Sequence, residues 1–376
     1  MRPRLLRRLA LAALAPAVLV LAACSSADKP KPTPLEAVQP KIGGRVAWQA
    51  KIDGVRFAML PATRGGQFTV ASTEGVVLAL AAETGQEAWR ATAGAALSAG
   101  VGSDGRFASV VTVRNEVVTF EGGRERWRQR VPARVVTPPF VAGERVFVMS
   151  VDRVVHAFDA LDGRRLWTLQ RPGEALTLAQ AGVLTNYRNL LLAGQGARLT
   201  AIDPLRGTVQ WEAPLATPRG TNEVERLSDL IGPAVRVGDR VCARSFQSAA
   251  GCADASRGAP LWSRGSGGAQ ALAADAERVI GADSSDRITA WRASNGDVLW
   301  TSERLQHRGL SGAVMFGGHA VFGDQEGQVH FLSAADGTTQ LRLPTDGSPV
   351  IGTPAVVGNT MLVVTRNGGL FAMRLN

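Results

Sequence analysis

Arg153-Val-Val-His-Ala-Phe-Asp-Ala-Leu-Asp-Gly-Arg-Arg-Leu-Trp167 is the stretch of sequence that decides the fold. Its first half alternates side chains with the period of two that a pleated β-strand requires. Leu161-Asp162-Gly163 is a turn, because Gly tolerates positive φ and Asp bonds to the backbone ahead of it. Leu166-Trp167 ends a second strand. A lone hairpin is at best marginally stable in water, so the stretch predicts a fold in which hairpins repeat.

The same hairpin recurs along the chain. Its copies end at Trp89, Trp127, Trp167, Trp211, Trp262, Trp300 and Leu341, the last with Leu in the Trp place. In five copies a Gly stands four residues before the Trp, namely Gly85, Gly163, Gly207, Gly258 and Gly296. Successive copies end 38 to 51 residues apart. A period near 40 residues is what four short strands per unit require, as in the blades of a β-propeller.

An eighth hairpin is divided between the two ends of the chain. It begins at Asn367-Gly-Gly-Leu-Phe-Ala-Met-Arg374, but the chain stops before its turn and its Trp. Gly44-Arg-Val-Ala-Trp48 has the form of the missing strand, and Trp48 lies 41 residues before Trp89. The sequence therefore predicts an all-β, eight-bladed propeller in which the N-terminal strand closes the last blade and leaves the ring without an open end.

The first 23 residues form a targeting segment. Four Arg precede an apolar run from Leu9 to Ala23, which is shorter than the roughly 20 residues needed to span a bilayer. The run ends in Leu21-Ala22-Ala23-Cys24, which resembles a bacterial lipobox. That resemblance implies that Cys24 is lipidated after cleavage, and Ser25 behind it favours release to the outer membrane. An ordinary secretory signal with a chance Cys is the alternative.

Residues 24–41 are Pro-rich and polar, which is typical of an extended tether, and residues 42–376 form the propeller. Removal of residues 1–23 takes away four Arg and no acids, and it lowers the formal charge from +10 to +6. A moderate positive charge favours acidic partners or is a composition bias spread over the surface. No basic run with interleaved aromatic residues indicates nucleic-acid binding.

The sequence offers no catalytic constellation, metal site or cofactor site. The four His have no metal-ligand spacing, and His156 and His330 occupy the same place in two different blades. Gly100-Val-Gly-Ser-Asp-Gly105 matches a dinucleotide fingerprint, but no helix follows, so it is a hairpin turn. Cys242 and Cys252 fall in the second and third strands of the fifth blade. In an oxidising compartment they form a cross-strand disulfide if their Cα atoms come within about 7 Å, and two free buried thiols are the alternative.

The repeat resembles that of pyrroloquinoline-quinone enzymes, whose propellers share the Gly-x-x-x-Trp hairpin. That family has an adjacent Cys-Cys pair and a calcium cluster in a longer chain, and this sequence has no Cys-Cys pair. The resemblance is therefore to the scaffold rather than to the chemistry. A quinone-dependent dehydrogenase stays as the alternative function, and visible absorbance after reconstitution with quinone and calcium distinguishes it.

Two loop segments carry a second resemblance. Gly220-Thr-Asn-Glu-Val-Glu-Arg-Leu-Ser-Asp229 is similar to the signature loop of the BamB family, lipoproteins of the outer-membrane β-barrel assembly machinery. Gly173-Glu-Ala-Leu-Thr-Leu178 is similar to the Leu-x-Leu segment of the same family. The lipobox, the tether and the eight blades extend the resemblance over essentially the whole chain.

This resemblance implies a non-enzymatic scaffold at the periplasmic face of the outer membrane that assists the insertion of β-barrel proteins. The implied partners are BamA, the barrel-inserting subunit, other subunits of the complex and unfolded barrel proteins. The residues implied to bind BamA are Leu176, Leu178, Arg226 and Asp229. The sequence departs from the family pattern at Ala179, where the family has Arg, and at Ile231, where it has a second Asp. Alternatively, the two Leu are core residues of a strand and the long loop is a tolerated insertion.

Overall fold

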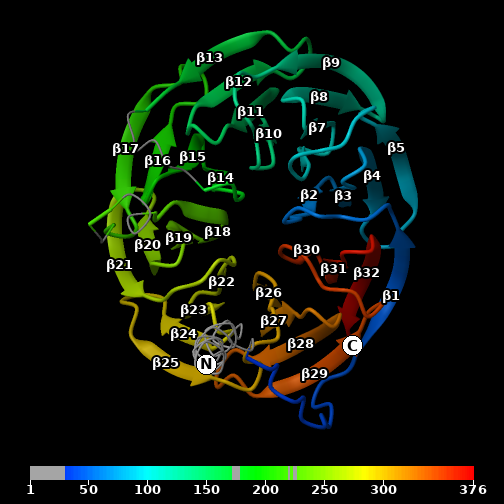
Figure 1. Cartoon of the computed structure of the whole chain (residues 1–376), viewed down its shortest axis with the longest axis vertical. Coiled ribbons are helices and arrows are strands. Elements are labelled where there is room, and N and C mark those ends of the chain that lie inside the picture. The colour runs from blue at the N-terminus through cyan, green and yellow to red at the C-terminus, as the bar shows by residue number, and fades with distance from the viewer. Residues whose placement is uncertain (1–29, 172–177, 219–220, 223–226) are drawn as a thin grey trace, which may run out of the picture. The chain divides into compact units, whose positions relative to one another are not determined.

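In the computed structural model, residues 30–171, 178–218, 221–222 and 227–376 are described. All regular elements among them are β-strands, and they form eight four-stranded antiparallel sheets arranged as the blades of a ring (Figure 1). No helix in the described part of the chain is long and apolar enough to cross a membrane. The predicted eight-bladed propeller is confirmed.

The strands of the first four blades run from the innermost to the outermost in chain order. Blade 1 contains β2 (Ala62–Arg64), β3 (Gln67–Ala71), β4 (Val76–Ala81) and β5 (Glu87–Thr92). Blade 2 contains β6 (Gly102–Ser103), β7 (Phe107–Val111), β8 (Glu116–Glu121) and β9 (Arg124–Arg130). Blade 3 contains β10 (Phe140–Ala142), β11 (Arg145–Met149), β12 (Val155–Asp159) and β13 (Arg165–Leu169). Blade 4 contains β14 (Leu184–Tyr187), β15 (Leu190–Gln195), β16 (Arg198–Ile202) and β17 (Val209–Pro214).

The next three blades have the same order. Blade 5 contains β18 (Leu230–Val237), β19 (Arg240–Ser245), β20 (Ala249–Asp254) and β21 (Ala259–Gly265). Blade 6 contains β22 (Ala273–Ala274), β23 (Arg278–Ala282), β24 (Ile288–Arg292) and β25 (Val298–Ser302). Blade 7 contains β26 (Val314–Phe316), β27 (His319–Gly323), β28 (Gln328–Ser333) and β29 (Thr339–Pro344). The hairpin predicted over residues 153–167 is formed by β12 and β13, and β13 continues two residues beyond Trp167.

Blade 8 is built from both ends of the chain. It contains β30 (Ala355–Val357), β31 (Thr360–Val364) and β32 (Gly369–Leu375), and its outermost strand is β1 (Gly44–Lys51). β1 pairs antiparallel with β32 along its length, from Gly44 opposite Leu375 to Lys51 opposite Gly369. The predicted closure by the N-terminal strand is therefore confirmed, and it joins the two ends of the chain within one blade through backbone hydrogen bonds.

Each repeat Trp joins its blade to the next one. The indole N–H of Trp127 donates to the carbonyl of Ala160 at 2.8 Å, and the ring lies against Gly163 in the turn of blade 3. A Cβ added at Gly163 would lie 2.6 Å from that ring, and Gly163 has a φ of 76°. Both constraints require Gly at this place. Leu341 replaces Trp at the junction with blade 8, where it lies against Gly44 instead of a hairpin turn.

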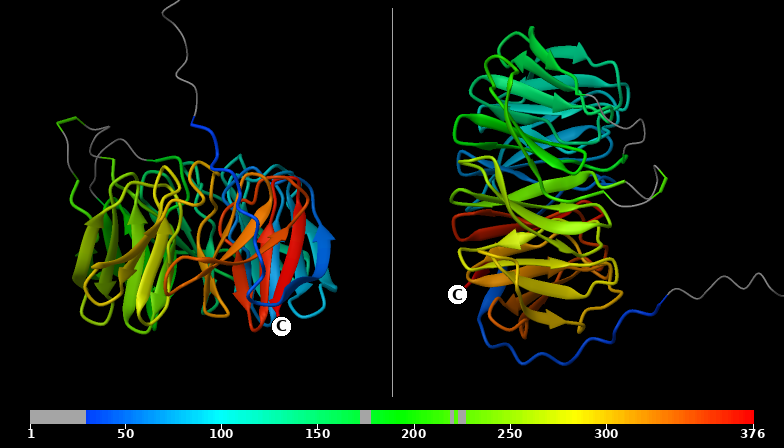
Figure 2. Two further views of the ribbon diagram at one scale, coloured as in Figure 1. Left: turned by 90° about the horizontal axis from the view of Figure 1, so that it is seen from below. Right: turned by 90° about the vertical axis from the view of Figure 1, so that its left-hand side faces the viewer.

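The strands alternate in direction, so the ring has two distinct faces. The turns between the second and third strands, together with the connections between blades, lie on one face, here called the loop face. The turns within the first and last hairpins of each blade lie on the other, here called the turn face (Figure 2). The middle strands of each blade are almost completely buried and supply most of the hydrophobic core.

The packed domain begins earlier than the sequence analysis places it. Thr33–Asn376 form one compact unit, and residues 33–41 lie against blade 7. Leu35 packs against the apolar core of blades 6 and 7, and the Lys41 N–H donates to the carbonyl of Gln340 at 2.8 Å. Because these contacts reach across about 300 residues of sequence, nothing in the local composition of the Pro-rich segment signals them.

Candidate partner-binding site

The candidate site lies on the loop face where blades 3, 4 and 5 meet. Of the residues that the sequence analysis assigns to partner binding, the structure describes Leu178 and Asp229. Leu176 and Arg226 lie outside the described residues. Leu178 belongs to the connection from β13 to β14, and Asp229 immediately precedes β18. The structure therefore brings together residues that are 51 positions apart in the sequence.

The Asp229 carboxylate joins three segments of the loop face. Its Oδ1 accepts hydrogen bonds from Nη2 of Arg153 at 2.9 Å and from Nε at 3.2 Å. Its Oδ2 accepts a hydrogen bond from the backbone N–H of Leu178 at 3.1 Å. The side chains of Arg153 and Asp229 are 15% and 16% exposed, so the ion pair is shielded but still reaches solvent. Such charge-assisted bonds are roughly twice as strong as neutral ones.

Backbone contacts hold this arrangement in place. The Asp229 carbonyl accepts a hydrogen bond from the N–H of Phe246 at 3.0 Å, and the Leu230 N–H donates to the carbonyl of Gly196 at 2.9 Å. The side-chain amide of Gln195 donates to the carbonyl of Arg153 at 2.8 Å. The site is thus fixed by hydrogen bonds to the turns of blades 3, 4 and 5.

Arg153 occupies a backbone position that an L-residue rarely adopts. Its φ is 64°, whereas blades 1, 7 and 8 have Gly at the corresponding place of the same turn, namely Gly75, Gly327 and Gly368. A non-Gly residue in the left-handed region costs about 1–2 kcal/mol. Strain of this kind is retained where a side chain is needed, and here the side chain is the one that holds Asp229.

Leu178 is half-buried and belongs to no strand, so it is not the core strand residue of the alternative interpretation. It lines a small hollow of about 40 Å³ together with Val136, Met149, Arg153 and Asp229. Next to it, Ala179 is exposed at the place where the family has Arg. Ile231 is 3% exposed and pairs with Gly182, so this chain fills with an apolar side chain the place of the family's second Asp.

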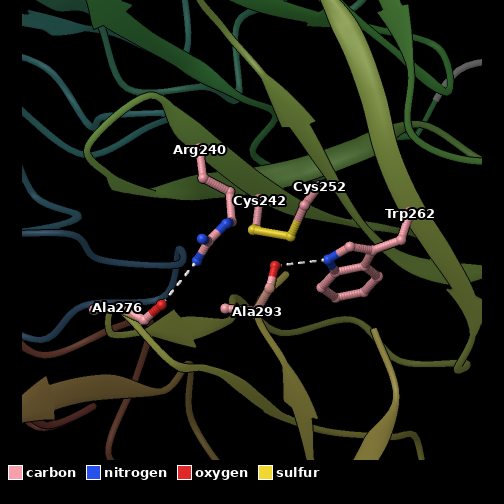
Figure 3. The surroundings of a disulfide bond; sticks show 6 residues. All are labelled: Arg240, Cys242, Cys252, Trp262, Ala276 and Ala293. Atoms are coloured by element: carbon pink, nitrogen blue, oxygen red, sulfur yellow. Dashed lines mark hydrogen bonds between the residues drawn. A yellow bond between two sulfur atoms is a disulfide. The ribbon is translucent and has the colours of Figure 1, made fainter. Parts of the chain in front are cut away.

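The two Cys of blade 5 lie opposite each other on neighbouring strands. Cys242 in β19 is paired with Cys252 in β20, and a disulfide joins their sulfur atoms (Figure 3). Both residues are at most 1% exposed, beside Trp262, whose indole N–H donates to the carbonyl of Ala293 at 2.9 Å. The disulfide therefore belongs to the packing between blades 5 and 6, away from the loop face.

The two His in matching places lie in separate blades, as predicted. His156 in β12 and His330 in β28 are both buried, and burial lowers the pKa of each ring. Among the described residues, no three His, Cys, Asp or Glu side chains gather in a way that could hold a metal ion. The central channel has a volume of about 520 Å³ and is lined by the innermost strands of all eight blades.

Arg153 is the site residue that sequence reasoning missed. A signal was present, because a long Arg side chain occupies the turn place where blades 1, 7 and 8 have Gly and blades 2 and 6 have the short Asn115 and Asp286. Its partner is 76 residues away in a different blade, however, so the turn alone does not identify what the side chain holds.

The fold and the site together define a class of protein: an eight-bladed propeller of quinoprotein-like repeats with a candidate site built from loops between blades. The family model described as outer membrane protein assembly factor BamB matches residues 35–98, 73–302 and 302–375. BamB of Burkholderia pseudomallei is 37% identical, with 96% of this chain and 97% of that protein aligned.

Two solved structures share the fold. The crystal structure of BamB from Moraxella catarrhalis superposes with a TM-score of 0.75 at 20% identity, over 88% of this chain and 97% of that one. The quinohemoprotein alcohol dehydrogenase from Comamonas testosteroni superposes with a TM-score of 0.67 at 14% identity, over 88% of this chain and 76% of that one. The chain belongs to the BamB family of outer membrane protein assembly factors.

Proposed function

We propose that this chain is a non-enzymatic, lipid-anchored subunit whose loop site binds BamA. The observation that carries the proposal is the meeting of Leu178 and Asp229 on one face of the ring. A half-buried Leu beside a fixed ion pair is a small apolar anchor with a polar rim, the usual composition of a binding hot spot. Leu176 and Arg226 belong to the same two connections and are part of the proposed surface.

The proposal includes lipidation of Cys24, which would hold the domain at the periplasmic face of the outer membrane. Each buried CH2 of an acyl chain contributes about 0.8 kcal/mol, so several chains suffice to anchor a folded domain. The other proposed partners are further subunits of the complex and unfolded barrel proteins. The outermost strands, such as β21 and β25, are sheet edges to which an extended segment can add by β-augmentation. Failure of any unfolded barrel protein to crosslink to these strands would count against this part.

The oxidised state of Cys242 and Cys252 is proposed for the protein in the cell as well. An oxidising periplasm allows a buried cross-strand disulfide to persist. Protein purified under acid quenching and unfolded without reductant should then leave both Cys unmodified by a thiol reagent. Labelling of both would show that the thiols are free.

The test of partner binding uses the mature lipidated chain and the periplasmic portion of BamA from the same organism. Leu176→Ala, Leu178→Ala and Asp229→Ala should each weaken binding by about 1 kcal/mol or more, the usual threshold for an interface residue that matters. Leu205→Ala is the matched control, because Leu205 is 61% exposed in a turn on the turn face of blade 4. That variant should bind like the unmodified protein.

Arg153→Ala separates direct contact from support. If Asp229 touches BamA itself, loss of Arg153 leaves part of the binding energy intact. If Asp229 acts only by holding the loops, Arg153→Ala and Asp229→Ala weaken binding equally. Circular dichroism confirms that each variant stays folded. Binding that ignores all four substitutions would move the site elsewhere, and the absence of binding by the folded, unmodified chain would overturn the BamA proposal.

A further inference from the structure

Residues 33–41, here called the strap, cross the outside of blade 7 from one face of the ring to the other. In Figure 2 the strap is the blue segment that descends along the orange blade toward the C-terminus. Its first residue contacts the connection between blades 6 and 7 on the loop face. Its last residue leads, through Ile42 and Gly43, to the beginning of β1 beside the C-terminal Asn376.

The loop-face end of the strap is fixed to a buried charge cluster. The N–H of Thr33 donates to the carbonyl of Gln306 at 2.9 Å, and the Thr33 carbonyl accepts a hydrogen bond from Nη1 of Arg308 at 3.1 Å. Arg308 is only 3% exposed, and its Nε donates to the fully buried Asp324 at 2.8 Å. Thr33 is thus bonded to a side chain that cannot move without breaking a buried ion pair.

The middle of the strap is held by side chains on both sides of its backbone. Leu35 packs against the apolar core of blades 6 and 7. The carboxylate of Glu36 accepts a hydrogen bond from Oγ1 of Thr339 at 2.8 Å and lies 3.2 Å from Nη1 of Arg304. The Glu36 carbonyl accepts a hydrogen bond from Nη1 of Arg342 at 3.0 Å. The strap is therefore docked by apolar burial, charge and backbone bonds at once.

We propose that the strap fixes where the lipid-bearing terminus leaves the ring, and that it thereby turns the loop face at blade 7 toward the membrane. The inference rests on the proposed lipidation of Cys24. With the strap docked, eight residues (25–32) separate Cys24 from Thr33, and they span at most about 28 Å. The candidate site at blades 3–5 lies on the same face, two to four blades away from blade 7.

An undocked strap would remove this constraint. The linker would then run over 17 residues, from 25 to 41, and would reach about 60 Å when fully extended. A linker of that length would let either face approach the lipid surface. The docked strap therefore selects one orientation of the ring. In that orientation the loop face, which carries the candidate site, faces the membrane.

The test places a fluorophore on either face of blade 7 in the lipidated full-length chain. Gln325→Cys lies in an exposed turn on the loop face, and Ala335→Cys lies in an exposed turn on the turn face of the same blade. Each labelled protein is bound to vesicles of phosphatidylethanolamine and phosphatidylglycerol that carry a headgroup quencher. The fluorophore at position 325 should be quenched more strongly than the one at position 335. Equal quenching, or stronger quenching at 335, would overturn the proposed orientation.

Release of the strap supplies the second arm. In the double variant Leu35→Asp/Glu36→Ala, which removes the apolar and the charged contacts of the strap together, the difference in quenching between the two labels should be lost, and amide exchange in residues 33–41 should become faster. Glu83→Ala, an exposed Glu on the turn face outside the strap, is the control and should change neither. Cys24→Ala distinguishes the two proposals. The variant protein should no longer bind the vesicles, and a variant that still binds them would overturn the lipid anchor. A lipid-anchored protein with equal quenching would instead overturn only the role of the strap.

Discussion

Two aspartates on the loop face each form an ion pair with an arginine. One pair is buried and stabilises the ring, whereas the other is partly exposed and is accessible to a partner. Asp324 in blade 7 accepts hydrogen bonds from Arg308, from His330 and from the N–H groups of Glu326 and Gln328. Asp324 is 0% exposed and Arg308 is 3% exposed. Asp229 holds Arg153 and the Leu178 N–H at the meeting of three blades, and both charged side chains are about one-sixth exposed.

The difference lies in burial rather than in the type of bond. A sealed ion pair has lost its hydration completely, so removal of one partner leaves an uncompensated buried charge. When an ion pair that still reaches water is broken, the protein loses less free energy of unfolding, because water solvates the remaining charge. Such a pair also stays available to a partner protein. The same residue types therefore stabilise the ring in blade 7 and form a candidate contact surface at blades 3–5.

Asp324→Ala should give the largest loss of stability. It leaves the buried His330 without a carboxylate and leaves Arg308 with only the exposed Glu326 as an ionic partner, which costs roughly 3–5 kcal/mol in the free energy of unfolding. Urea denaturation followed by Trp fluorescence measures the change. Glu74→Ala, an exposed Glu in the corresponding turn of blade 1, is the control and should stay within about 0.5 kcal/mol of the parent. A similar small loss for Asp324→Ala would show that the buried cluster does not support the ring.

Asp229→Ala should destabilise the chain less, by about 1.5–3 kcal/mol, the range for hydrogen bonds to charged groups. Arg153→Ala should cost a similar amount, because the backbone strain at the positive φ is the same for Arg and Ala and cancels. If Arg153 and Asp229 act as a pair, the double variant loses less free energy of unfolding than the two single variants lose together, because the same bonds are removed only once. Strict additivity in urea denaturation would contradict the ion pair as the link between the loops.

The architecture of the ring could be predicted from the sequence because its determinants are local and repeated. A Gly four residues before a Trp marks the turn of one blade and the side chain that packs on the next, as Gly163 and Trp127 illustrate. Strand closure followed from counting, since Trp48 lies one period before Trp89 and has the same strand form.

The site and the strap were less accessible to prediction because their contacts are long-range. Leu178 and Asp229 were found only through resemblance to a family, and Arg153 was missed because its partner lies in another blade. Residues 33–41 have no apolar periodicity, and their bonds go to backbone and side chains of blade 7 about 270 to 300 positions away. A pattern confined to neighbouring residues carries no information about such contacts.

His330 should make the stability of the sealed cluster depend on pH. Burial lowers the pKa of its ring below the ordinary value of 6.5, although Asp324 opposes this effect, and the nearby cations Arg342 and Arg308 add to it. The unfolded chain therefore binds the proton more readily, so the contribution of His330 is fully present above pH 6.5 and is lost as the pH falls through the lowered pKa.

The measurement is the free energy of unfolding between pH 7 and pH 5. Each unit by which the pKa is lowered corresponds to about 1.4 kcal/mol. The parent should lose stability over this range, and His330→Asn should lose less. Asp324 affects stability at lower pH. Burial alone would raise the pKa of Asp324, but the hydrogen bonds from His330, Gln328 and Arg308 outweigh burial and lower this pKa to about 2. Its contribution is lost only as the pH falls from about 4 toward 2. An identical slope for His330→Asn and the parent would contradict a buried neutral ring.

Glu36→Ala should have the smallest effect on global stability and completes the series of three carboxylates ordered by burial. Thr339 lowers the pKa of Glu36 through a hydrogen bond, burial opposes this shift, and Arg304 adds to it. Glu36 is 44% exposed and Arg304 is 51% exposed, and ion pairs of this kind contribute about 0–1 kcal/mol. The expected change in the urea midpoint is correspondingly small and decreases further at high salt, where exposed charges are screened. If Glu36→Ala instead destabilised the chain as much as Asp324→Ala, burial would not be what separates support from surface in this ring, and the strap would have to count as part of the core.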